Sequence, residues 1–449
     1  MRTGTLKKEE RITTEIGAQH ESAKGVFDNL ILHIHPRTVP EQTLKYTLTW
    51  GLGGMGVLLV LLQIATGILL MLVYEPSPSK AYESILVLQN EVVFGQFIRN
   101  IHYWSANILV VVVFLHLLRV YFTGAFYRPR RFNWILGWCL LVFVLASNFT
   151  GYLLPWDQLA FWAITICTGM FEYIPGLGMW LQKVIRGGSE VGSNTLLNFF
   201  TLHTSIIPFC LILFMAFHFW HVRRAGGVVV PKHSNEEQEM RPNYVDTIPN
   251  LAFRELVVAL VLIAFILVFS IFFDVSLADH ANPGMSPNPT KAPWYFAGIQ
   301  EMLLHIHPLF AVFIIPAAAL LGLMILPYLS YQTRGTGVWF LSRMGQRTAI
   351  LGAVIALLLT PTIIILDEFV VHVNARSSGI SPAVSHGLLP AFLLLLAVIV
   401  FYLLVRKKFS ATKNESAQAV FVMLVVAFVL MTVICALFRG QGMKLMWPW

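Results

Sequence analysis

Nine apolar runs, each of roughly 20 residues, constrain this 449-residue chain more than any other feature. A helix needs about 20 apolar residues to cross the hydrocarbon core of a bilayer. Only 12% of the residues are charged, whereas a soluble domain has about a quarter. The sequence therefore predicts an all-α fold, a polytopic membrane helix bundle with about nine transmembrane helices. The runs lie at about 50–74, 101–123, 133–154, 202–222, 251–273, 309–329, 347–367, 385–405 and 418–438.

The connecting segments suggest four parts and an orientation. Residues 1–47 are predicted to be an amphipathic segment on the cytoplasmic surface, 48–225 a four-helix domain, 226–250 a polar linker and 251–449 a C-terminal domain. Basic residues are concentrated in the N-terminal segment and after the second, fourth, sixth and eighth runs. Cytoplasmic loops are enriched in Lys and Arg, so the N-terminus is expected in the cytoplasm. The net charge of +8 is attributed to these loops, not to nucleic-acid binding.

Histidines recur at matched intervals in two of the runs. His102 and His116 are 14 residues apart, and His203 and His218 are 15 apart. At about 1.5 Å and 100° per residue, each interval places two imidazoles on nearly one helix face, ~21 Å apart. Two such helices side by side would form one pair near each membrane surface, and each pair could hold a flat cofactor with a central iron. A lone histidine in a span is more often bonded to the backbone, but two matched pairs favour ligands.

Glycines in two other runs are separated by the same interval as His102 and His116. Gly53 and Gly67 are 14 residues apart, as are Gly137 and Gly151. Missing side chains at these depths would let flat macrocycles approach the helix backbone. Close helix packing through small residues is the alternative.

The four cysteines form no CxxCH group, so c-type haem attachment is not indicated.

These features resemble the cytochrome b subunit of the cytochrome bc family, the quinol:cytochrome c or plastocyanin oxidoreductases, with the N- and C-terminal halves fused. The likeness also includes Arg99, Arg119, the run from Gly151 to Gln158, and Pro293-Trp294-Tyr295. It implies a bacterial inner-membrane protein that oxidises quinol at the outer face. Electrons would cross the membrane through two non-covalent b-type haems to an inner quinone site, in a Q cycle with proton translocation. The implied partners are a Rieske-type iron–sulfur protein, a c-type cytochrome, the quinone pool and membrane lipids, in a homodimeric complex.

The resemblance implies roles for individual residues near the haems. His102 and His203 would ligate the outer haem, and His116 and His218 the inner one. Arg99 and Arg119 would bind haem propionates through paired hydrogen bonds, although snorkelling to the interface is the alternative reading.

The inner quinone pocket is less distinct in the sequence. Arg223 and His221 are its candidates, and each can equally be an ordinary polar residue at a helix end. In the photosynthetic branch a cysteine tethers an extra haem, and Gly51 occupies that place here. A third haem on the inner side is therefore doubtful.

The outer quinol pocket departs from the family pattern. Residues 151–162 would form one wall, and Pro293, Trp294 and Tyr295 the other. The family motif reads Pro-Glu-Trp-Tyr, whereas this chain has Ala292 before Pro293. A proton acceptor is still needed because quinol oxidation releases protons. We expect Glu301 to substitute; the alternative is a carboxylate with a structural partner.

Two other functions are compatible with the histidine pairs. One is a di-haem anchor that passes electrons between the quinone pool and a periplasmic redox enzyme. The other is a transporter with structural histidines. The aromatic motif at Trp294 favours the quinol-oxidising reading, because an anchor needs only one quinone site.

Overall fold

The computed structural model describes residues 35–231, 242–329, 337–371 and 381–447. Most of the predicted amphipathic segment 1–47 lies outside these residues. Within them, nine helical segments are long and apolar enough to cross a membrane. The prediction of an all-α bundle with about nine spans is confirmed. The spans are Leu52–Met71, Gly95–Phe122, Arg131–Tyr152, Ser193–Arg224, Thr247–Phe272, Leu309–Tyr328, Arg343–Val370, Val384–Lys408 and Lys413–Phe438.

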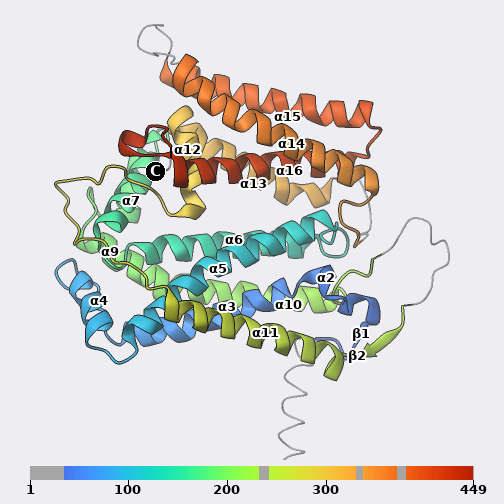
Figure 1. The fold of residues 1–449 in the computed structure, drawn as a ribbon, viewed down its shortest axis with the longest axis horizontal. Coiled ribbons are helices and arrows are strands. Elements are labelled where there is room, and N and C mark those ends of the chain that lie inside the picture. The colour runs from blue at the N-terminus through green and yellow to red at the C-terminus, as the bar shows by residue number, and fades with distance from the viewer. Residues whose placement is uncertain (1–34, 232–241, 330–336, 372–380, 448–449) are drawn as a thin grey trace, which may run out of the picture.

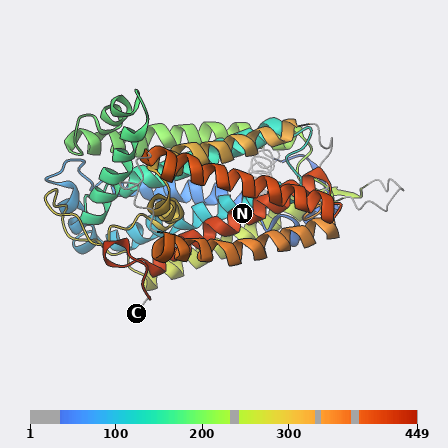
Figure 2. The same ribbon diagram turned by 90° about the horizontal axis from the view of Figure 1, so that it is seen from above.

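The helices that build these spans run along one common axis (Figures 1 and 2). Their bounds are α3 Leu52–Met71, α5 Gly95–Phe122, α6 Arg131–Tyr152, α9 Ser193–Thr201, α10 Ile207–Arg224, α11 Thr247–Phe272, α13 Ile315–Ile325, α14 Arg343–Leu366, α15 Leu389–Lys408 and α16 Lys413–Val433. α3 packs on α5, and α10 on α6, in the N-terminal half. In the C-terminal half, α14 packs extensively on α16.

Short turns of π-helix precede a proline in three spans, once inside the span and twice at its start. They are η3 Leu202–Ile206, η4 Leu309–Ile314 and η8 Val384–Leu388. The following α-helices have Pro208, Pro316 and Pro390 at their second residue. Proline has no N–H to donate to the preceding turn, so the backbone there widens. One of these turns contains His203.

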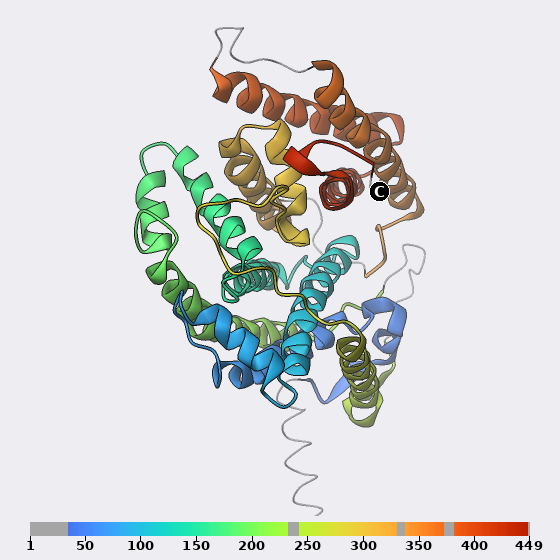
Figure 3. The ribbon, with the colours of Figure 1, turned by 60° about the vertical axis from the view of Figure 1, so that its left-hand side comes forward.

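Shorter elements gather at the two ends of the bundle. At one end, the α7 end, lie α4 Ala81–Asn90, α7 Gln158–Gly169, α8 Gly178–Arg186 and α12 Trp294–His305 (Figure 3). At the other, the β1 end, strand β1 Thr38–Pro40 pairs antiparallel with β2 Tyr244–Asp246, and α2 Tyr46–Thr49 follows. This small sheet was not expected from the sequence. It ties the segment before the first span to the predicted linker.

The core of the N-terminal half lies where α3, α5, α10 and α11 meet. Leu59, Leu109 and Ile266 are among its buried members. Apolar side chains on α14 and α15, by contrast, are largely exposed, for example Leu358 and Leu395. Broad apolar exposure along helices of this length fits a bilayer as the surrounding solvent. These two helices therefore present apolar side chains outward.

Candidate functional site: two histidine pairs and an aromatic pocket

Two pairs of histidines face each other between α5 and the α9–α10 span. The ring centroids of His102 and His203 are 6.2 Å apart, and those of His116 and His218 are 6.5 Å apart. The first pair lies toward the α7 end and the second toward the β1 end. This is the pairing expected from the sequence intervals.

The separation within each pair suits one metal ion between two imidazoles. An imidazole nitrogen binds a metal at about 2 Å, and half a ring adds about 1 Å on each side. A metal held by both rings therefore leaves the centroids about 6 Å apart. Within the described part of the chain, no group of three or more metal-binding side chains is present. Each pair thus fits an ion that brings its other ligands with it, as the iron of a haem does.

Hydrogen bonds orient the two histidines nearer the α7 end. Nδ1 of His203 lies 2.9 Å from the carbonyl oxygen of Ser147. Nδ1 of His102 lies 2.9 Å from Oγ1 of Thr66, whose hydroxyl donates to the carbonyl of Leu62. In both cases Nδ1 is the donor, so Nε2 is left to bind a metal. A second hydrogen bond of this kind is typical of metal-ligating histidines.

Each of the four interval glycines lies against one of the four histidines. A Cβ added to Gly67 would lie 3.4 Å from Cε1 of His102, and one added to Gly53 3.5 Å from Cε1 of His116. For Gly137 and Cε1 of His218 the distance would be 3.7 Å, and for Gly151 and Cε1 of His203 only 2.5 Å. The glycines therefore leave room for the imidazoles themselves. That these glycines also leave room for a haem macrocycle stays a prediction.

The two predicted propionate-binding arginines have different surroundings. Arg119 donates from Nε to the carbonyl of Leu48 at 2.9 Å, and its buried Nη2 has no partner among the residues that the structure describes. A buried guanidinium nitrogen without a partner is costly, so an anionic group there would be stabilising. Arg99 instead donates to the carbonyls of Val275 and Ser276. Its predicted role at a propionate is untested.

The two predicted pocket walls meet at the α7 end. Asp157 caps α7 by accepting from the amide of Ala160, and its other oxygen accepts from the amide of Ala278. Gln158 accepts from the amide of Asn282 at 2.6 Å. These bonds hold the segment after the third span to the segment before α12. Burial raises the pKa of the Asp157 carboxyl.

The aromatic motif begins α12. Pro293 precedes the helix, and Trp294 donates from Nε1 to Oδ1 of Asn107 on α5 at 2.6 Å. Tyr295 packs against the core of the N-terminal half, and burial raises the pKa of its phenol. The motif therefore lies where α12 meets the histidine-bearing helix.

Glu301 lies two turns further along α12, fully buried among charged groups. Arg439 donates to it from Nε at 3.0 Å and from Nη2 at 2.6 Å. His305 lies 3.3 Å from Glu301 through Nε2 and 2.6 Å from Asp367 through Nδ1. Arg439 also donates to Glu368. The sequence analysis identified Glu301 but missed Arg439, Asp367 and Glu368, because charges at the ends of spans ordinarily indicate only a membrane interface.

The ionisation of this cluster follows from its contacts. Burial opposes ionisation of Glu301, but hydrogen bonds from His305 and Arg439 outweigh burial and lower the pKa of the carboxyl. Burial likewise opposes ionisation of His305, but Glu301 and Asp367 outweigh it and raise the pKa of the imidazole. The lowered pKa favours the anionic form of Glu301, and the raised pKa favours the charged form of His305.

The candidates for the second quinone pocket lie at the β1 end of α10. The ring of His221 lies 5.2 Å from that of Phe132, and Arg223 is exposed near the helix end. Both are close to the β1-end histidine pair along the chain. Their predicted roles are untested.

The bundle and its two facing histidine pairs define a class, the membrane cytochromes whose haems lie between transmembrane helices. The family model for cytochrome b/b6/petB matches residues 39–226. Cytochrome b6 of Prochlorococcus marinus (strain AS9601) is 42% identical over 175 residues, which are 39% of this chain and 80% of that protein. Cytochrome b6 of Heliomicrobium gestii is 43% identical over 204 residues, 45% of this chain and 91% of that protein.

The fold extends the likeness over both halves of the chain. A chain of the solved hyperthermophilic respiratory Complex III superposes with a TM-score of 0.61 at 21% identity, covering 89% of this chain and 93% of that chain. This chain belongs to the cytochrome b family. It is a multi-pass membrane protein of electron transfer that binds b-type haem and quinone, as the sequence resemblance predicts.

Proposed function

We propose that this chain is the cytochrome b subunit of a bc-type quinol:cytochrome c oxidoreductase operating a Q cycle. Quinol is oxidised at the α7 end, and quinone is reduced at the β1 end. The observation that carries the proposal is the pair of centroid distances, 6.2 and 6.5 Å, between histidines at two depths of one bundle. Two b-type haems, when bound, supply a redox path between the two membrane faces.

The four histidines are the proposed axial ligands, His102 with His203 and His116 with His218. Arg119 is the best-supported propionate-binding residue, because no described residue pairs with its buried Nη2. A third, thioether-linked haem is not part of the proposal. The position at which a cysteine would be needed is Gly51, which has φ +67 and whose added Cβ would lie 3.0 Å from Val258.

The quinol site is proposed between residues 151–162 and the start of α12. Trp294 is fixed by its bond to Asn107, and Tyr295 presents a phenol that stays protonated because its pKa is raised. A protonated phenol donates a hydrogen bond and does not accept a proton. The proton acceptor must therefore be another group.

Glu301 with His305 is the proposed proton acceptor in place of the motif glutamate. Oxidation of quinol to quinone releases two electrons and two protons. Glu301 is held by Arg439 as an anion, so His305 is the member that changes charge. Asp367, whose side chain is 44% exposed, lies on the far side of His305. The competing role of Glu301 is structural, as the partner of Arg439, and the Glu301→Gln variant decides between the two: unchanged quinol turnover with lowered stability leaves only the structural role.

The complex is proposed to contain a Rieske-type iron–sulfur protein and a c-type cytochrome, and to form a homodimer. We place it in a bacterial inner membrane with the N-terminus in the cytoplasm, so that the β1 end is the inner face. The basic segments that follow the even-numbered spans support this orientation.

Haem counting tests the central claim. A reduced-minus-oxidised spectrum with pyridine haemochrome analysis of the purified protein is expected to give two b-type haems per chain. His203→Leu is expected to remove the haem near the α7 end, and His218→Leu the other. The matched control is His221→Leu, which lies one turn from His218 and is expected to retain both. A colourless protein, or two haems in either ligand variant, contradicts the proposal.

A further inference from the structure

The contacts around Glu301 lead from a closed interior to an open edge of the α7 end. The side chain of Glu301 is 0% exposed, that of His305 is 15% exposed and that of Asp367 is 44% exposed. Nε2 of His305 lies 3.3 Å from Oε1 of Glu301, and Nδ1 lies 2.6 Å from Oδ2 of Asp367. One imidazole therefore connects a buried carboxylate to a carboxylate at the surface.

The segment after the last span covers the arginine of this cluster. The amide of Leu445 donates to Oε1 of Glu368 at 3.1 Å, and the amide of Gly442 donates to Oδ1 of Asn288 at 2.6 Å. These bonds hold the segment against the end of the seventh span and the loop before α12. The side chain of Arg439 is left only 1% exposed.

Two branches leave Glu301, and only one of them can carry a proton. The first runs through Arg439 to Glu368. A guanidinium keeps all its protons and has no acceptor, so this branch ends at the arginine. The second runs through His305, whose two ring nitrogens can each bind and release a proton. Nε2 of His305 also lies 3.3 Å from Nη2 of Arg439, so it can accept there while the ring is neutral.

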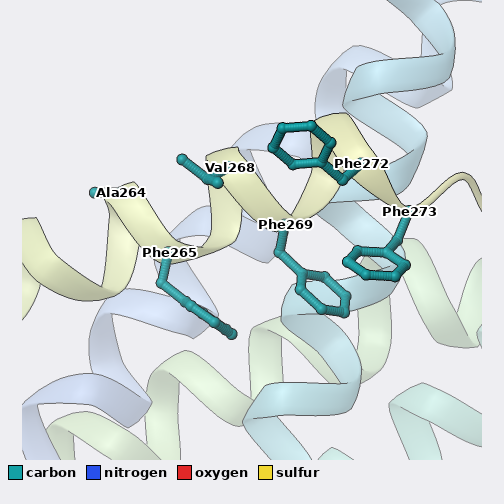
Figure 4. Close-up of a pocket in the computed structure, with 6 residues that line it drawn as sticks. All are labelled: Ala264, Phe265, Val268, Phe269, Phe272 and Phe273. Carbon is teal, nitrogen blue, oxygen red and sulfur yellow. The ribbon is translucent and has the colours of Figure 1, made fainter.

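The groove on α11 shows by contrast what such a path requires. Its lining consists of Ala264, Val268 and four phenylalanines, as Figure 4 shows. None of these side chains has a group that binds or releases a proton. That surface suits hydrocarbon, whereas the branch through His305 offers a titratable group at every step.

We propose that Asp367 is the exit residue through which protons released by quinol oxidation leave the chain. The inference rests on the proposed function, in which Glu301 with His305 accepts those protons. Neutral His305 accepts a proton at Nε2 and passes its Nδ1 proton to Oδ2 of Asp367, which releases it to water near the end of the seventh span. An N–H bond breaks as an O–H bond forms, and no electron moves in this step. Rotation of the ring restores the starting tautomer.

Turnover of the purified complex with a soluble quinol tests the exit role. The amide oxygen of Asp367→Asn can still accept a hydrogen bond from Nδ1 of His305, but it cannot take up the proton. The variant is therefore expected to lower kcat about a hundredfold, the scale of a lost proton-transfer group, at unchanged KM. Acetate, a small weak acid, is expected to restore part of the rate, and Asp367→Glu is expected to retain most of it.

The matched control is the neighbouring acid on the branch that ends at the arginine. Glu368→Gln weakens the ion pair with Arg439 and leaves the path through His305 intact. It is expected to lower the melting temperature and to keep the parent kcat. A variant that is merely less stable would therefore be distinguished from one in which proton exit is blocked.

Three outcomes overturn the exit role while the parent complex oxidises quinol. They are an unchanged kcat in Asp367→Asn, an equal fall in Asp367→Asn and Glu368→Gln, and a loss that neither acetate nor Asp367→Glu relieves. The last would mean that Asp367 is only a structural partner of His305. A parent complex that does not oxidise quinol contradicts the proposed function itself, and the exit role with it.

Discussion

Arg439 and Glu301, 138 residues apart in the sequence, form a two-point ion pair that is almost completely buried. The pair joins the segment after the last span to α12, the helix that begins with the aromatic motif. The same guanidinium reaches Glu368 at the end of the seventh span. One arginine thereby links three segments of the C-terminal half at the α7 end.

Removing this arginine is expected to cost much stability. Arg439→Leu leaves the buried Glu301 carboxylate without its cation, and breaking a buried pair in this way costs about 3–5 kcal/mol. Thermal unfolding of the purified protein measures the loss. The control is Lys80→Ala, which breaks an exposed pair with Glu83; exposed pairs contribute little. Equal melting temperatures for Arg439→Leu and the parent protein would show that the pair is not stabilising.

Stability is expected to depend on pH through His305. Glu301, Asp367, Glu368 and Arg439 surround this imidazole, and its pKa in the folded protein is raised above the ordinary 6.5. The charged imidazole thus contributes stability that is fully present below pH 6.5 and is lost as the pH rises through the higher folded pKa. His305→Gln should flatten the decline of melting temperature above pH 6.5. An identical slope in parent and variant would count against this assignment.

The four glycine positions beside the histidines should differ in how well they tolerate replacement by alanine. A Cβ at Gly151 would lie 2.5 Å from the His203 ring, whereas one at Gly137 would lie 3.7 Å from that of His218. The first distance forces the ring to move, and the second is ordinary contact. Gly151→Ala should therefore lower haem content severalfold, whereas Gly137→Ala should leave haem content nearly unchanged. Haemochrome titration checks the order, and equal losses would contradict it.

Arg119 should influence one haem electrostatically. Its buried cation stabilises added negative charge nearby, including the electron of a reduced haem. Arg119→Gln should lower the midpoint potential of the haem near the β1 end and leave the other unchanged. Spectroelectrochemical titration resolves the two. The control is Arg254→Gln on α11, whose guanidinium donates to the carbonyl of Asn250 within its own helix. Equal shifts in both variants would mean a general charge effect.

Much of the N-terminal half could be predicted because its information is local. Apolar runs of bilayer length identify spans, and an interval of 14 or 15 residues returns a side chain to one helix face. Those two rules predict the helices and the facing of His102 with His203. The predicted start of the fourth span at 202 was late, since the structure begins that span at Ser193. Polar residues at its beginning hid the first two turns.

The short sheet could not be predicted from the sequence in the same way. Thr38–Pro40 and Tyr244–Asp246 are only three residues long and lie far apart in the sequence. Three residues are too few to show the alternating pattern of a strand. The pairing of two strands so far apart along the chain depends on long-range contacts. The burial of Glu301 was also beyond sequence reasoning, because its partner Arg439 lies just after the last apolar run, where a basic residue ordinarily indicates the interface.

The sequence by itself predicted the nine apolar helices of membrane-spanning length that the described residues form, and the two matched histidine pairs, because hydropathy and helical period act within one segment. Only the tertiary structure decided which charges meet at the α7 end and which glycine leaves least room for its histidine. Those properties depend on packing between segments that are distant along the chain, and packing is set by the whole bundle at once.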